Sequence, residues 1–171
     1  MGQNITCLIT NKNIEVDKNI VHFRINNVLF VPFEILTSLS GFIENAKDFE
    51  NISELFDDYN KYTAEDLIFD DHEERHSVLD IIKFVNDYQI EDFIIEHSSD
   101  FADIPVDSFF MTVMNNKIMK DSLVFDEEQF SMNNAIHNIE KYTAFFNSKI
   151  TWAADSKFHS YPTAERHYKN Q

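Results

Sequence analysis

The chain has 171 residues and carries 30 Asp and Glu against 14 Lys and Arg, so its formal net charge is −16. Hydrophobic residues make up 43% of the chain, with 17 Phe and 6 Tyr among them, which excludes a disordered acidic segment as a description of the whole chain. With only 2 Gly, it also lacks the glycine-rich loops that hold phosphate in nucleotide-binding proteins. We expect one folded domain over residues 1–150 that needs no metal or disulfide to bury a core.

Two segments near the N-terminus alternate in polarity with the period of strands, residues 5–10 and 21–25. Asn26 and Asn27 separate the second segment from the apolar run 28–31. Because Asn tolerates left-handed backbone angles, this pair predicts a two-residue hairpin turn. The N-terminal region is therefore predicted to be an antiparallel meander of about three strands.

From Pro32 onward the apolar residues recur at helical spacing. Five segments show such a stripe, and we expect a helix over each of them: 32–46, 51–59, 78–88, 105–119 and 132–146. The short apolar run 90–97 does not distinguish helix from strand. The predicted fold class is α+β, with the N-terminal antiparallel meander of about three strands followed by four or five packed helices.

The end of the chain, residues 151–171, is polar and slightly basic. We expect a loosely held tail after the domain that ends at residue 150.

Cys7 is the only cysteine, which rules out an internal disulfide and fits a reducing compartment. In an alternating strand, a lone cysteine is most often a small buried hydrophobe. No apolar run approaches the roughly 18 residues of a membrane-spanning helix, and the N-terminus lacks the pattern of a secretion signal. We therefore expect a cytoplasmic protein without a membrane partner.

The negative charge is concentrated in the middle of the chain. Residues 44–107 hold 20 of the 30 acidic residues and 4 of the 14 basic ones, which leaves 10 of each elsewhere. Like charges one helical turn apart cost an isolated helix a few tenths of a kcal/mol per pair, so folding gives no reason to collect them. A one-signed field does attract cationic surfaces and repel nucleic acid. The predicted partner-binding residues are Glu50, Glu54, Asp57, Asp58, Glu65, Asp66, Asp70, Asp71, Glu73 and Glu74.

These features predict a non-enzymatic acidic inhibitor without a cofactor, whose partner is a basic protein. The specific hypothesis is a bacterial immunity protein that neutralises a cognate toxin by covering its basic active-site surface. An alternative is a DNA mimic that blocks restriction or other defence enzymes, since helical carboxylates about 5 to 6 Å apart resemble the roughly 7 Å step between phosphates.

A second alternative rests on residues 72–76, whose sequence His-Glu-Glu-Arg-His matches the H-E-x-x-H pattern of zinc-dependent hydrolases. Glu96 or His97 would be the third ligand. The charged Glu74 and Arg75 at the two x positions instead favour a solvated helix start.

Overall fold

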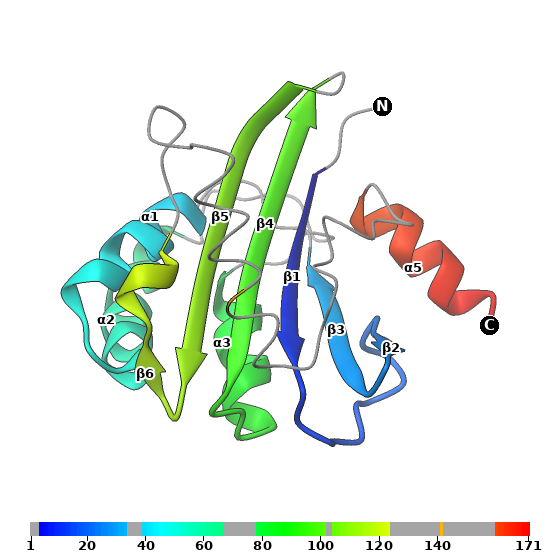
Figure 1. The fold of residues 1–171 in the computed structure, drawn as a ribbon, viewed down its shortest axis with the longest axis horizontal. Helices are drawn as coiled ribbons and strands as arrows, with labels where there is room; N and C mark the ends of the chain where they lie inside the picture. Colours follow the sequence, from blue (N-terminus) through cyan, green and yellow to red (C-terminus); the bar gives the residue numbers. More distant parts are fainter. Residues whose placement is uncertain (1–3, 34–38, 67–77, 102–103, 124–140, 142–159) are drawn as a thin grey trace.

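The structure, a computed structural model, describes residues 4–33, 39–66, 78–101, 104–123, 141 and 160–171. Its centre is a six-stranded antiparallel sheet in the order β2-β3-β1-β4-β5-β6 (Figure 1). The strands are β1 (Asn4–Thr10), β2 (Phe23–Ile25), β3 (Val28–Phe33), β4 (Phe93–Phe101), β5 (Ile104–Met114) and β6 (Lys117–Ile118). The helices are α1 (Leu39–Asn45), α2 (Ile52–Asp66), α3 (Val78–Asp87) and α5 (Tyr161–Lys169), with 3-10 turns η1 (Ala46–Asp48) and η3 (Lys120–Ser122).

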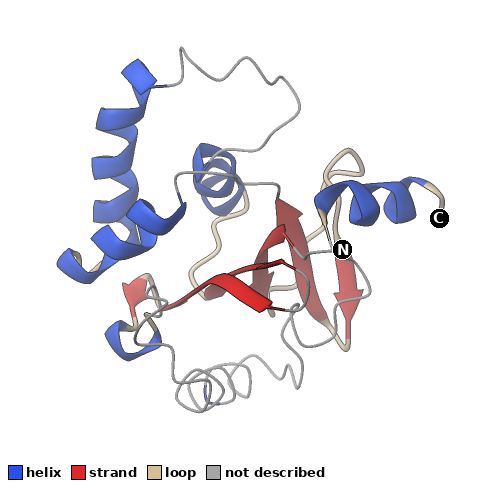
Figure 2. Ribbon diagram, turned by 90° about the horizontal axis from the view of Figure 1, so that it is seen from above, coloured by secondary structure: helices blue, strands red, loops and turns tan. Residues whose placement is uncertain are grey.

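Both faces of the sheet carry buried apolar residues, and each strand contributes to both faces because its successive side chains point to opposite sides. Leu8 of β1 belongs to the larger core cluster, which includes buried residues of α1, α2 and α3. Its neighbours Cys7 and Ile9 belong to a smaller cluster on the other side, together with Ala164 of α5. Seen from above in Figure 2, α1, α2 and α3 lie on the same side of the sheet.

The hairpin predicted at Asn26 and Asn27 is confirmed. Both residues have positive φ, 51° and 68°, and Ile25 pairs with Val28 across the turn. A second Asn-Asn turn was not predicted. It joins β5 to β6 through residues 115 and 116, with φ angles of 50° and 63°.

The predicted fold class is wrong in its strand count and connectivity. The described part of the chain has six strands and four α-helices in place of about three strands and four or five helices. The N-terminal strands are not a meander either, because β1 pairs with β3 and β4, and β2 pairs only with β3. Strand β1 is therefore central to the sheet, which a local sequence pattern does not reveal.

The helix predicted over 105–119 is also wrong, since this region contains β5, the turn and β6. Phe110 and Thr112 are buried on one face of the sheet, and Met111 and Val113 are buried on the other. A strand covered on both sides loses the polar alternation that identifies strands, and its apolar residues can then match a helical spacing by chance. The ambiguous run 90–97 also proves to be largely strand, because its residues from Phe93 onward belong to β4.

Two predicted helices are present near their expected positions. The helix predicted at 51–59 is α2, which begins directly after Asn51 and continues to Asp66. The sheet positions its start, because Ile52 N–H donates to the Asn116 carbonyl (2.9 Å) and Ile118 N–H donates to the Glu50 carbonyl (3.0 Å). The helix predicted at 78–88 is α3.

The remaining predictions meet the described residues only in part. In place of a helix beginning at Pro32, β3 continues to Phe33 and α1 begins at Leu39. The helix predicted over 132–146 lies outside the described residues apart from Lys141. In the C-terminal segment, where we expected a loose tail, α5 buries Ala164 completely against the sheet. The domain boundary at residue 150 stays a prediction.

Candidate functional site

The acidic residues that the structure describes gather on α1, η1 and α2. We call this group the acidic surface, and it consists of Glu44, Asp48, Glu50, Glu54, Asp57 and Asp58. All of them are exposed except Asp58, which is half-buried. The carboxylates face outward because the opposite side of each helix packs into the core. The core residues on that side are Phe42 and Ile43 of α1, and Ile52, Leu55 and Phe56 of α2. The carboxylates are therefore displayed on the outer side of a fixed helix pair.

Aromatic contacts hold the two helices together beneath the acidic surface. The Phe42 ring stacks on Phe56, with 6.2 Å between centroids, and meets Tyr59 edge-on at 5.5 Å. Phe42 is only 1% exposed. Because close-packed aromatic rings restrict relative motion, the backbone that carries these carboxylates is preorganised.

Basic residues offset part of the charge near the start of α2. Lys47 forms an exposed ion pair with Glu44 at 3.7 Å, a type of contact worth at most about 1 kcal/mol. The Lys120 ammonium donates to the carbonyls of Ala46 (3.0 Å), Lys47 (2.8 Å) and Phe49. These contacts bring positive charge close to residues 46–50 and leave the part of α2 beyond that end more strongly anionic.

Three carboxylates of α2, those of Glu54, Asp57 and Asp58, form no ion pair with these lysines in the described part of the chain. Glu54 accepts a hydrogen bond from the Asn51 side chain at 3.2 Å. Within the described part of the chain, Asp57 and Asp58 show no ion pair. The basic helix α5 does not neutralise them, because it lies at the opposite end of the sheet from α2 (Figures 1 and 2).

The last turn of α2 contains two more of the predicted residues, Glu65 and Asp66, and no basic residue. Acidic residues at this end oppose the helix dipole, so their position gives no stability to the helix. Asp70, Asp71, Glu73 and Glu74 lie outside the described residues, and their role in binding stays a prediction.

The zinc hypothesis gains no ligand set from the described residues. His72 and His76 lie outside them. Glu96 and His97 are neighbours in β4 and therefore point to opposite faces of the sheet. His97 is 8% exposed and shares a 2.9 Å hydrogen bond with the Thr6 hydroxyl through Nδ1. Among the residues that the structure describes, no group of three or more His, Cys, Asp or Glu is placed to bind a metal.

Cys7 is a buried structural residue, as expected, with no exposed surface. Burial, and secondly the charge of Glu96, raises the pKa of the Cys7 thiol well above its ordinary value. Nucleophilic cysteines need the opposite, a lowered pKa and solvent access.

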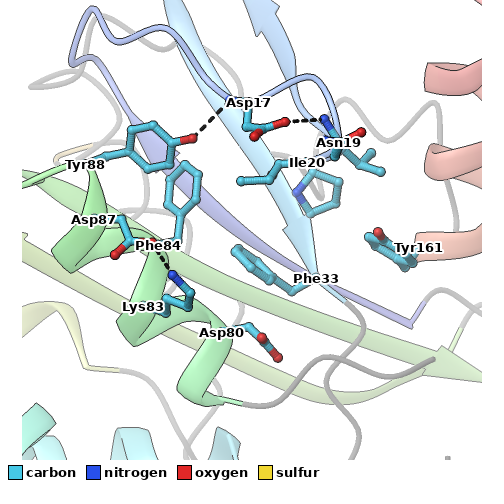
Figure 3. A pocket seen from close by; sticks show the side chains of 12 residues that line it. Asp17, Asn19, Ile20, Phe33, Asp80, Lys83, Phe84, Asp87, Tyr88 and Tyr161 are labelled. Atoms are coloured by element: carbon cyan, nitrogen blue, oxygen red, sulfur yellow. Dashed lines mark hydrogen bonds and ion pairs between the residues drawn. The ribbon is translucent and has the colours of Figure 1, made fainter. Parts of the chain in front are cut away.

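A groove of about 390 Å³ lies beside the C-terminal end of β3, beyond the residues that pair with β2 (Figure 3). It is lined by residues from the 17–21 loop, from the end of β3, from one side of α3, and by Tyr161 of α5. No sequence pattern reveals this groove, since its lining comes from four separate segments. The one local indication was the row of polar residues on α3, Asp80, Lys83 and Asp87, opposite its apolar stripe.

The chain matches no model of a known protein family, no curated protein and no solved structure. None of the helices in the described ranges combines the length and the apolar character needed to cross a bilayer. The acidic surface and the groove are therefore the features from which a function is inferred.

Proposed function

We propose that this protein is a non-enzymatic inhibitor that acts in the cytoplasm and uses its acidic surface to cover a basic surface of a partner protein. The partner we favour is a bacterial toxin, which makes this chain the immunity protein that neutralises it. The observation that supports the proposal is the display of Glu54 and Asp57 on the exposed side of a helix whose other side is packed into the core.

The charge arrangement has a cost in the free protein that a partner would remove. Glu54 lies three and four residues before Asp57 and Asp58, so each pair repels along the helix. A cationic surface placed over these carboxylates would add an attraction to the partner that outweighs their mutual repulsion. A one-signed patch also steers an oppositely charged partner and raises the association rate by about 10 to 1000-fold at low salt.

The test is the association rate of a charge-reversed variant. The variant carries Glu54→Lys, Asp57→Lys and Asp58→Lys, and its binding is measured by stopped-flow fluorescence at low salt against the protein encoded immediately upstream. We expect association to slow by at least tenfold, with a smaller change in dissociation, since exposed charges act mainly on encounter.

A matched control separates the surface from the net charge. Glu15→Lys, Glu91→Lys and Glu165→Lys change the net charge by the same amount, at positions outside the acidic surface. This control should associate within about threefold of the wild-type rate. Equal slowing in both triple variants would show that only total charge matters, and an unaffected first variant would remove α2 from the interface.

The DNA-mimic alternative is favoured by the spacing of Glu54, Asp57 and Asp58 along one helix. Selectivity distinguishes it from an immunity protein. A mimic should displace duplex DNA from several unrelated DNA-binding proteins at similar concentrations. An immunity protein should bind one toxin tightly and leave the other complexes intact.

A further inference from the structure

The groove at the edge of β3 has an aromatic interior. Four rings line it, from Phe33, Phe84, Tyr88 and Tyr161. Phe84 meets Phe33 edge-on with 6.3 Å between centroids and lies 4.6 Å from Tyr88. In Figure 3, Phe33 and Phe84 lie between α3 and the 17–20 segment, with Tyr161 on the far side. Aromatic faces carry partial negative charge and attract cations.

Charged residues at the mouth of the groove are mostly acidic. Asp17, Asp80 and Asp87 contribute three carboxylates, and Lys83 contributes one ammonium. Lys83 is paired with Asp87, and both side chains are exposed, at 72% and 53%. The groove therefore combines aromatic walls with a net negative mouth, which favours a cationic occupant.

Hydrogen bonds fix the position of Asp17 at this mouth. Its backbone N–H donates to the Tyr88 hydroxyl oxygen at 3.0 Å, and its carboxylate accepts from the Asn19 N–H at 2.8 Å. The loop is thus tied to the end of α3, and Figure 3 shows both contacts. The side of the groove formed by Asp17 and Tyr88 is preorganised.

The edge of β3 itself does not favour an added strand. Ile25 and Val28 close the two-residue hairpin, so even-numbered residues of β3 direct their backbone groups away from β1. At the groove the residue in this position is Pro32, which has no N–H to donate to a new strand. An added strand would therefore lack a main-chain hydrogen bond at this position, which favours an occupant that binds through a side chain.

We propose that this groove binds an arginine side chain of the basic partner. A guanidinium group is planar, stacks on aromatic rings and forms hydrogen bonds with carboxylates, and the groove offers both kinds of contact. Its volume of about 390 Å³ lies in the lower part of the range of about 300 to 1,000 Å³ for ligand sites. The groove includes Tyr161 of α5, which lies at the opposite end of the sheet from α2 (Figure 1), so a partner that engages both the acidic surface and the groove must extend over α3, which packs on the same face as α2. This inference rests on the proposed function for the identity of the partner.

The test uses two small probes and the unaltered protein. N-acetyl-arginine amide is titrated into the ¹⁵N-labelled full chain at physiological salt, and N-acetyl-citrulline amide, which has nearly the same shape but no charge, is titrated in parallel. We expect saturable shifts of backbone amide NMR signals at residues 17–21, 33, 80–88 and 161, with citrulline at least tenfold weaker. Equal binding of citrulline, shifts centred on α2, or no saturation would overturn the proposal.

A pair of variants then separates the groove from general charge attraction. Asp80→Asn should weaken arginine binding about fivefold or more, and Asp57→Asn, which removes the same charge from the acidic surface, should leave it within twofold. Equal weakening by both would also overturn the proposal. Because these probes contain no partner protein, failure here leaves the acidic surface untouched, and the α2 charge-reversal experiment decides the proposed function separately.

Discussion

Three threonines are buried completely in the sheet, and their hydroxyl groups differ in hydrogen bonding. Thr6 is bonded to His97, and the Thr10 hydroxyl donates to the Asp92 carbonyl at 2.8 Å. The hydroxyl of Thr112 has no hydrogen-bond partner among the described residues. Replacing threonine by valine exchanges the hydroxyl for a methyl group of similar size. The same substitution should therefore have opposite effects at Thr10 and Thr112.

The expected changes in the free energy of unfolding depend on whether each buried hydroxyl makes hydrogen bonds in the folded state. At Thr112 the substitution removes a hydroxyl whose loss of water contacts is not compensated, so Thr112→Val should raise the free energy of unfolding by about 1 kcal/mol. At Thr10 it removes two hydrogen bonds, the one donated to the Asp92 carbonyl and the one accepted from the Lys12 N–H at 3.2 Å, which should lower that free energy by about 1 to 3 kcal/mol. The two variants should then differ by at least about 2 kcal/mol.

Urea denaturation at 25 °C, followed by circular dichroism, measures both free energies. Thermal unfolding gives a second readout, since about 1 kcal/mol corresponds to a shift in Tm of about 2 to 4 °C for a chain of this size. The reasoning is refuted if Thr112→Val destabilises the protein as much as Thr10→Val does. That result would mean that the Thr112 hydroxyl contributes a hydrogen bond to the folded state.

Three other predictions concern Cys7, the first Asn-Asn turn and the charges of α2. The Cys7 thiol should react with a chromogenic disulfide reagent only in denaturant. Because its pKa is raised in the folded state, its contribution to stability is full below the unfolded-state pKa and is lost as pH rises above it. Wild-type stability should therefore fall more steeply at alkaline pH than that of Cys7→Ala, and parallel profiles would contradict this. Asn27, with φ of 68°, should tolerate Gly, while Asn27→Ala should cost about 1 kcal/mol in thermal unfolding; no loss would mean that the turn relaxes. Asp57→Asn with Asp58→Asn removes the repulsion of these carboxylates by Glu54 and also their attraction to Lys61 one helical turn later, so the free energy of unfolding should change by at most a few tenths of a kcal/mol at low salt, and a decrease of about 1 kcal/mol or more would show that these carboxylates stabilise the fold.

Local chemistry explains the elements that were predicted correctly. The turn at Asn26 and Asn27 depends on the tolerance of Asn for positive φ, which is a property of the residue itself. The start of α2 after Asn51 and the stripe of α3 likewise follow from patterns within one helix. Asn115 and Asn116 also adopt positive φ, but the helical spacing of the apolar residues around them predicts a helix in place of the turn.

The C-terminal helix could also have been found from the sequence. Tyr161, Ala164 and Tyr168 have helical spacing, and all three pack in the smaller core cluster. Ser160 and Thr163 form a capping box, with a 3.2 Å contact from the Ser160 N–H to the Thr163 hydroxyl oxygen. The stripe consists of only three apolar residues in an otherwise polar segment, which is why the composition of the segment indicates a tail.

The sequence by itself determined the excess of carboxylates, their concentration between residues 44 and 107, and the turns and helices that depend on neighbouring residues. Only the tertiary structure decided that β1 lies between β3 and β4, that β5 is a strand, and that Asp17, Pro32, Phe84 and Tyr161 line one groove. The physical reason is that strand pairing and burial on both faces depend on contacts between residues far apart in the chain. Periodicity along the chain reports one exposed and one buried side, and it loses this information wherever the fold covers both.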